Sequence, residues 1–146
     1  MLISDRFINQ LIRHEGTKKS GEKHMPYKCP AGKLTIGFGR NIEDNGITDA
    51  EARTLLRNDI LTAESELRTA FPWFDELDEV RQGVLVNMAF NMGAPKLKGF
   101  KKTLAYIEAG KYKEAAAEML DSAWARQVKG RAAELASQME TGEFYK

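Results

Sequence analysis

The start of the chain carries apolar side chains at helical spacing, namely Phe7, Ile8, Leu11 and Ile12. Ser4 precedes this stripe and is a good N-cap, and Gly16 follows it as a natural terminator. The pattern predicts a helix that ends near Glu15. The next segment, 17–26, has almost nothing to bury and contains turn-forming residues, so we predict an exposed loop there.

The apolar period changes after this loop. Two short runs of strand-like character, Tyr27–Cys29 and Leu34–Phe38, flank the turn-forming segment 30–33. This arrangement predicts a β-hairpin.

Longer helical stripes fill the rest of the chain. A capping box at 48–51 opens an apolar stripe that predicts a long helix over about 48–70. The group 71–74 interrupts this stripe, and a second one that ends at Gly93 predicts a central, well-buried helix. Three shorter helices are then predicted, over about 100–109, 112–120 and 131–141.

Strands confined to the first third and helices elsewhere indicate an α+β fold that is mostly helical. We predict a single domain over 1–146 with an N-terminal lobe at about 1–50. A connecting helix at about 48–70 leads to a helical lobe at about 71–146, which is packed with the first helix. A cleft between the lobes is then expected, and ligand sites favour such junctions.

The composition excludes several classes of function. With 22 Lys plus Arg against 21 Asp plus Glu, the formal net charge is +1, so the strong general attraction to nucleic acid is missing. The first residues contain no unbroken apolar run, which predicts neither a signal peptide nor stable membrane insertion. A single Cys and two His are too few for the usual zinc site, and we expect no metal and no cofactor.

The charges are unevenly distributed along the chain. Basic side chains predominate over 14–40, acidic ones over 43–81, and four lysines gather again within 96–102. Such basic segments are either solvated surface or a positive rim that faces an anionic polymer, for which bacterial peptidoglycan is suitable.

Glu15 is the candidate proton donor of the chain. A helix C-terminus presents the negative end of the helix dipole and a cleft removes water, and both effects favour the protonated form of a carboxyl group. Glycoside hydrolysis needs such an acid on the leaving oxygen, and in most mechanisms a second group that activates water or stabilises positive charge. Cys29 and Thr35, on the two strands of the predicted hairpin, are candidates for this second group.

The ordered motifs of the chain resemble those of phage lysozymes, the endolysins of glycoside hydrolase family 24. The resemblance covers nearly the whole chain, through the blocks Glu15-Gly16, Tyr27-Lys28-Cys29, Gly32 to Gly39, Gly46-Ile47-Thr48, Asn87 to Gly93, Trp124 to Gln127, Arg131-Ala132 and Thr141-Gly142. It implies a muramidase that hydrolyses the β-1,4 bond between N-acetylmuramic acid and N-acetylglucosamine.

The resemblance also implies roles for individual residues. Glu15 matches the general acid, Thr35 the residue that positions water, and Cys29 stands where the best-known members have Asp. The segment between Glu15 and Cys29 is longer than the family's common pattern, and the additional residues fall within the 17–26 loop, where they would form a flap over the substrate.

Cys29 has two interpretations as a functional residue. Neighbouring cations such as Lys28 and Lys33 would lower its pKa and leave a thiolate in place of the carboxylate. Alternatively, Cys29 stays protonated, and Thr35 with a bound water does most of the positioning. A third, purely structural interpretation is a small thiol packed under the hairpin.

Three residues of the helical lobe match further positions of the family. Arg131 matches the arginine that pairs with the catalytic Glu, and the alternative is an ordinary arginine at a helix N-terminus. Phe90 and Thr103 match residues that contact sugar, with Thr103 where the pattern has Ser, and Phe90 is equally explained as a core residue.

The leading hypothesis is therefore an inverting lysozyme that acts as a monomer and releases phage progeny by cutting the host wall. It would be made in the host cytoplasm and would need a separate holin-like, membrane-permeabilising protein to reach the periplasm. The alternatives are a lytic transglycosylase that cleaves the same bond with one acidic residue, and a peptidoglycan-binding protein without catalysis.

Overall fold

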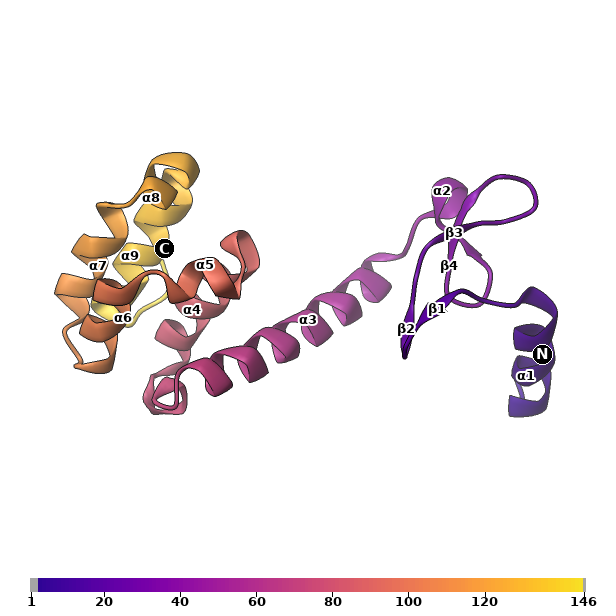
Figure 1. Ribbon diagram of the computed structural model, residues 1–146, viewed down its shortest axis with the longest axis horizontal. Helices are drawn as coiled ribbons and strands as arrows, with labels where there is room; N and C mark the ends of the chain where they lie inside the picture. The colour runs from indigo at the N-terminus through magenta and orange to yellow at the C-terminus, as the bar shows by residue number, and fades with distance from the viewer. Residues whose placement is uncertain (1–2, 146) are drawn as a thin grey trace. The chain divides into compact units, whose positions relative to one another are not determined.

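The computed structural model describes residues 3–145 of the chain (Figure 1). The chain forms two compact units, the first ending at Leu55 and the second beginning at Leu56. In the described residues all strands belong to the first unit, whereas the second is helical. The α+β class is thus confirmed, and the predicted cleft between two lobes and the packing of the first helix on the helical lobe stay predictions.

The first unit opens with the predicted helix, α1 (Asp5–Glu15). The Ser4 hydroxyl accepts a hydrogen bond of 3.2 Å from the backbone N–H of Phe7, which satisfies one of the free donors of the first turn. Gly16 ends the helix with φ at 70° while its own N–H donates to the Ile12 carbonyl at 3.1 Å. Glu15 therefore holds the last helical position, as the sequence predicts.

The segment 17–26 is exposed as predicted, but it is not a plain loop. Two short strands, β1 (Lys19–Ser20) and β2 (Lys23–His24), pair antiparallel and form a ribbon, which we call the 19–24 ribbon. The apolar pattern missed it because neither face of this ribbon is buried, so backbone hydrogen bonds and a turn at Gly21 define it instead.

The predicted hairpin is confirmed and belongs to a larger sheet. Strands β3 (Tyr27–Lys28) and β4 (Leu34–Ile36) pair antiparallel, and β5 (Arg40–Asn41) adds a third strand on the other side of β4. The second strand is shorter than predicted, because the chain leaves β4 in a turn at Gly37, Phe38 and Gly39. Both glycines have positive φ, 68° and 90°, which only glycine adopts readily. A short helix, α2 (Ile42–Asn45), follows the sheet.

The long helix predicted over about 48–70 is α3 (Asp49–Ala70). Its capping box is complete: the Thr48 N–H donates to Glu51 Oε1 at 2.8 Å, and the Glu51 N–H donates to Thr48 Oγ1 at 3.1 Å. The boundary between the two units falls within this helix.

The second unit is built around the predicted central helix, α4 (Glu79–Met92), which follows a short 3₁₀ turn, η1 (Phe74–Glu76). The helices predicted over about 100–109, 112–120 and 131–141 are confirmed as α6 (Lys101–Glu108), α7 (Tyr112–Leu120) and α9 (Gly130–Thr141). Two further helices, α5 (Ala94–Lys98) and α8 (Ala123–Val128), are too short to show a helical period.

The core of this unit consists of side chains from α4 and the helices around it. Its largest fully buried members are Phe74, Leu67, Leu85, Met88, Leu97, Ile107, Met119, Met139 and Val84. None of the helices that residues 3–145 form combines the length and the apolar character needed to cross a bilayer.

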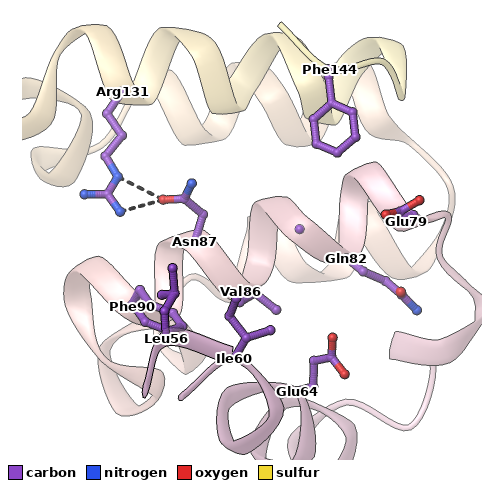
Figure 2. A pocket seen from close by; sticks show the side chains of 11 residues that line it. Leu56, Ile60, Glu64, Glu79, Gln82, Val86, Asn87, Phe90, Arg131 and Phe144 are labelled. Atoms are coloured by element: carbon purple, nitrogen blue, oxygen red, sulfur yellow. Dashed lines mark hydrogen bonds between the residues drawn. The ribbon is translucent and has the colours of Figure 1, made fainter. Parts of the chain in front are cut away.

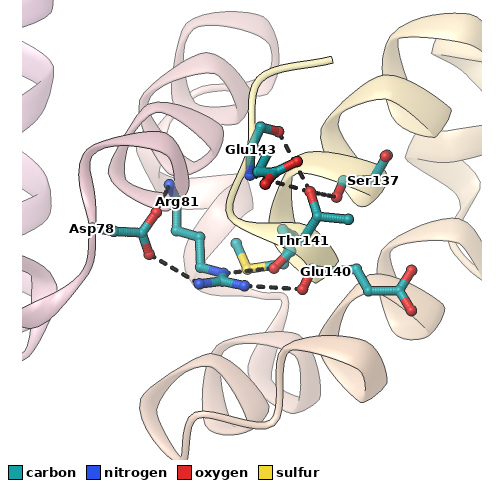
Figure 3. Close-up of polar contacts among 7 residues, drawn as sticks. Asp78, Arg81, Ser137, Glu140, Thr141 and Glu143 are labelled. Atoms are coloured by element: carbon teal, nitrogen blue, oxygen red, sulfur yellow. Dashed lines mark hydrogen bonds and ion pairs between the residues drawn. The ribbon is translucent and has the colours of Figure 1, made fainter. Parts of the chain in front are cut away.

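Arg81 of α4 connects the central helix to the last one (Figure 3). Its Nε donates to the Met139 carbonyl at 2.6 Å and its Nη2 to the Glu140 carbonyl at 2.9 Å, so it satisfies two acceptors near the C-terminus of α9. Nη1 donates to Asp78 Oδ1 at 3.1 Å, and the guanidinium carbon lies 3.6 Å from the centre of the Tyr112 ring. These contacts fix the end of α9.

Candidate active site

Glu15 lies against the turn that follows β4. A methyl group on Gly39 would lie 3.0 Å from Glu15 Oε2 and 3.2 Å from its Cδ, so only a glycine leaves room for the carboxylate at this distance. The Glu15 side chain is exposed in the first unit. The end of α1 and the β4–β5 turn thus meet at this carboxylate, although they are far apart in the sequence.

Cys29 and Thr35 come together around one backbone carbonyl. The Thr35 hydroxyl donates to the Lys33 carbonyl at 2.9 Å, and the Cys29 N–H donates to the same oxygen at 3.0 Å. Thr35 lies in the middle strand and is only 2% exposed, with Tyr27 and Asn41 paired to it on either side. A side chain that is buried on the middle strand of a sheet and hydrogen-bonded to the backbone has little freedom to move.

The pKa of the Cys29 thiol is lowered from its ordinary value, chiefly by a hydrogen bond from the Lys33 backbone. Partial burial opposes this shift, and hydrogen bonds from the Ala31 backbone and the Thr35 hydroxyl add to it. One of the interpretations from the sequence was that neighbouring lysine cations lower this pKa. The Lys33 ammonium instead pairs with Asp44 at 3.2 Å and with Glu43 at 3.6 Å, so the turn backbone is the principal cause.

Phe90 and Arg131 line the same pocket of the second unit, whose volume is about 440 Å³ (Figure 2). Arg131 donates to Asn87 Oδ1 through Nε at 2.9 Å and through Nη2 at 2.6 Å. Phe90 is 43% exposed, which excludes a purely core role within this unit. Asn87 was part of the matching motif but was not predicted as a site residue, and its side chain gives no signal for this role outside the folded structure.

Thr103 lines a different hollow, of about 290 Å³, together with Lys101, Lys102 and Ser122. It is 4% exposed, so that only a small part of it faces this hollow. The structure therefore brings Phe90 together with Arg131 but places Thr103 elsewhere in the second unit. Within residues 3–145, no three side chains of the types His, Cys, Asp and Glu gather as metal ligands would.

The α+β fold and the residues of the first unit are compatible with an enzyme that cleaves glycosidic bonds. Glu15 at the end of α1 supplies the carboxyl group that glycosidic bond cleavage requires as its acid, and Cys29 and Thr35 belong to the same unit. The comparisons agree with this class. The family model described as phage lysozyme matches residues 17–139. This range includes all the predicted site residues except Glu15, which lies two positions before its start. The chain belongs to the phage lysozyme family.

Proteins from two different organisms show the same similarity. The probable T4-type lysozyme 1 of Dictyostelium discoideum is 31% identical over 164 aligned positions, which cover 92% of this chain and 94% of that protein. The probable T4-type lysozyme 2 of the same organism is also 31% identical, over an alignment that covers 84% of this chain and 89% of that protein. The pre-baseplate central spike protein Gp5 of Enterobacteria phage T4 is 33% identical over 89% of this chain, but only 25% of that protein is covered.

Family membership makes the chain a glycoside hydrolase with lysozyme-like muramidase activity, and its substrate is bacterial peptidoglycan.

Proposed function

We propose that this chain hydrolyses the β-1,4 bond between N-acetylmuramic acid and N-acetylglucosamine with inversion at the sugar carbon, and that Glu15 is the general acid. The observation that carries the proposal is the contact of the Glu15 carboxylate with Gly39, at the exit of the strand that holds Thr35. The turn limits the space on one side of this carboxyl group, and general acid catalysis requires an acid in a defined position.

In the proposed reaction Glu15 transfers its proton to the oxygen that bridges the two sugars. The bond between this oxygen and the sugar carbon breaks, and the electron pair stays on the oxygen. A water molecule attacks the carbon from the opposite face and loses its proton to a base. The attacking water provides the new hydroxyl group, so the products together contain one more water than the substrate.

Cys29 and Thr35 are proposed to serve the water side of this reaction. The lowered pKa of Cys29 supports the thiolate, which provides a negative charge against the developing positive charge and accepts the proton of the water. The Thr35 hydroxyl donates its one proton to the Lys33 carbonyl, so its oxygen lone pairs are the proposed acceptor of a hydrogen bond from the water.

The remaining residues are proposed as binding groups. Phe90 and Thr103 contact sugars of the glycan, and the exposed ring of Phe90 supports such contact. The pairing of Arg131 with Glu15, which the family resemblance implies, stays a prediction. Asn87, whose oxygen accepts both hydrogen bonds from Arg131, is proposed to orient that guanidinium.

The biological role that we propose is lysis of the host at phage release. The enzyme, a monomer made in the host cytoplasm, would reach the wall in the periplasm after a separate holin-like protein permeabilises the membrane. The family that the chain belongs to supports this role through its phage lysozyme description.

The test compares the wild type with Glu15→Gln on permeabilised bacterial cells. This substitution removes the acid and keeps the shape, so clearing should stop while binding to purified peptidoglycan persists. Glu22→Gln is the matched control, because Glu22 is an exposed carboxylate in the turn of the 19–24 ribbon. Equal clearing by wild type and Glu15→Gln would refute the assignment of the acid.

Mass spectrometry of the released muropeptides distinguishes the two possible reactions. Hydrolysis incorporates the oxygen of labelled water at the new reducing end, whereas a lytic transglycosylase leaves an anhydro sugar with no added water. A wild-type protein that binds peptidoglycan and releases no fragments would instead be a binding protein without catalysis.

A further inference from the structure

The 19–24 ribbon and the residue Thr17 before it contact the 37–39 turn, which lies beside Glu15. Thr17, just before the ribbon, donates its hydroxyl proton to the Gly37 carbonyl at 2.9 Å. The same hydroxyl oxygen lies 2.8 Å from Nδ1 of His24, in strand β2. The His24 ring meets the ring of Phe38 edge to face, with 4.7 Å between the ring centres. The turn at 37–39 is thus held at two of its three residues.

The protons of this arrangement can be assigned from the donors available. A threonine hydroxyl has a single proton, and the Gly37 carbonyl can only accept, so the Thr17 proton points to Gly37. Nδ1 of His24 must then be the donor in its contact with Thr17. Because both the neutral Nδ1–H tautomer and the imidazolium carry this proton, the contact persists whether or not His24 is charged.

The three residues of the turn connect the ribbon to the carboxylate of Glu15. Gly37 is bound by Thr17, Phe38 by His24, and Gly39 lies against Glu15. Gly37 and Gly39 have no side chains, so the two ends of the turn cannot be held in place by side-chain packing. Contacts from the ribbon therefore replace the packing that a less flexible turn would have.

We propose that Thr17 and His24 are positioning residues for Glu15, which hold the 37–39 turn so that Gly39 stays beside the carboxylate. The proposal rests on the proposed role of Glu15 as general acid.

The test uses Thr17→Val, which keeps the shape and removes the hydroxyl, and Thr17→Ser, which restores it. We expect Thr17→Val to lower kcat roughly three- to tenfold with KM nearly unchanged, because the acid is misplaced by a fraction of an ångström while Thr17 does not bind sugar. Thr17→Ser should recover most of the loss. The unfolding midpoint should change little, since both hydrogen bonds of Thr17 are exposed and such bonds contribute little to the free energy of unfolding.

Thr69→Val is the matched control, because the Thr69 hydroxyl also donates to a backbone carbonyl, that of Ser65 at 3.1 Å, on an exposed face of α3. It should leave kcat and KM unchanged. If Thr17→Val proves unfolded at the assay temperature, His24→Ala takes its place, since it keeps the hydrogen bond from Thr17 to Gly37. His24→Ala should lower kcat by a smaller factor than the one expected for Thr17→Val and leave KM unchanged.

Wild-type kcat in Thr17→Val, a parallel rise in KM, or a Thr17→Ser variant as impaired as Thr17→Val would each overturn the positioning role. Glu15→Gln, assayed alongside, separates this failure from that of the proposed function. If Glu15→Gln is inactive while Thr17→Val equals wild type, only the positioning role is wrong. If Glu15→Gln keeps its turnover, the acid itself has been misassigned.

Discussion

Replacing Gly39 by Ala tests the contact on which the candidate site depends. The new methyl group would lie 3.0 Å from Glu15 Oε2, whereas ordinary van der Waals contacts begin near 3.4 Å. The carboxylate is the far end of a flexible side chain, so it is the group that moves. We expect it to shift by roughly half an ångström, because the backbone of the turn is tethered at Gly37.

Two effects of this substitution have separate magnitudes. Ala at a φ of 90° is strained, and such strain costs about 1–3 kcal/mol of stability. Misplacing a catalytic group by about 1 Å can reduce the rate about a hundredfold, so a shift of about half that distance should lower kcat roughly tenfold. The activity loss should therefore exceed what the folded fraction alone explains.

The assay measures kcat on purified peptidoglycan together with the unfolding midpoint in urea, for Gly39→Ala and for a control. Gly110→Ala is the control, because Gly110 has a φ of 75° and no atom within 4 Å of its added methyl group. It should lose a similar amount of stability and keep wild-type kcat at temperatures where it is folded. Wild-type kcat in Gly39→Ala, or equal kcat losses in the two variants, would refute the reasoning.

Three further predictions concern other parts of the molecule. Arg81→Met should lower the free energy of unfolding by about 2–3 kcal/mol, because the carbonyl groups at the end of α9 lose a charged donor, and an unchanged urea midpoint would contradict this. If Cys29 acts as a thiolate, Cys29→Asp should keep activity, while Cys29→Ser should lose activity roughly a hundredfold. The pH at which activity is lost on acidification should be lower in Cys29→Asp than in the wild type. Equal activity of both variants would exclude a charge requirement. Hydrogen bonds from Arg40 lower the pKa of Glu51 to about 2 from 4.5, so this pair stabilises the folded state fully above pH 4.5 and ceases to do so as the pH falls toward 2. Glu51→Gln should therefore reduce the decline of the melting temperature over that pH window, and an unchanged decline would show that the pair does not contribute.

Helices with a long apolar stripe could be predicted from the sequence, and those without one could not. The helix α3 was located within a residue of its ends, because a capping box and a glycine-free stripe leave few alternatives. The helices α5 and α8 were missed, since five or six residues do not complete enough turns to show a period. The strand β5 was missed for a similar reason, because two residues cannot show alternation.

The candidate site shows the same division between local and non-local information. Glu15, Cys29 and Thr35 were singled out because helix ends, strands and a family motif are local features of the sequence. The sequence suggested nearby lysine cations as one possible cause of a lowered Cys29 pKa, and it did not indicate the Lys33 backbone N–H, because a contact of that kind depends on the shape of the turn. The partnership of Asn87 with Arg131 also escaped prediction, because it joins α4 to α9.

The sequence by itself determined the α+β class, the residues that end α1, and the chemistry available to the site, since these depend on caps, periodicity and residue type. Only the tertiary structure decided that the carboxylate of Glu15 lies against Gly39 and that Thr17 donates a hydrogen bond to Gly37 of the same turn. Contacts of this kind join residues about twenty positions apart. Their distances depend on backbone angles such as the positive φ of Gly37 and Gly39, which the residue order permits but does not specify.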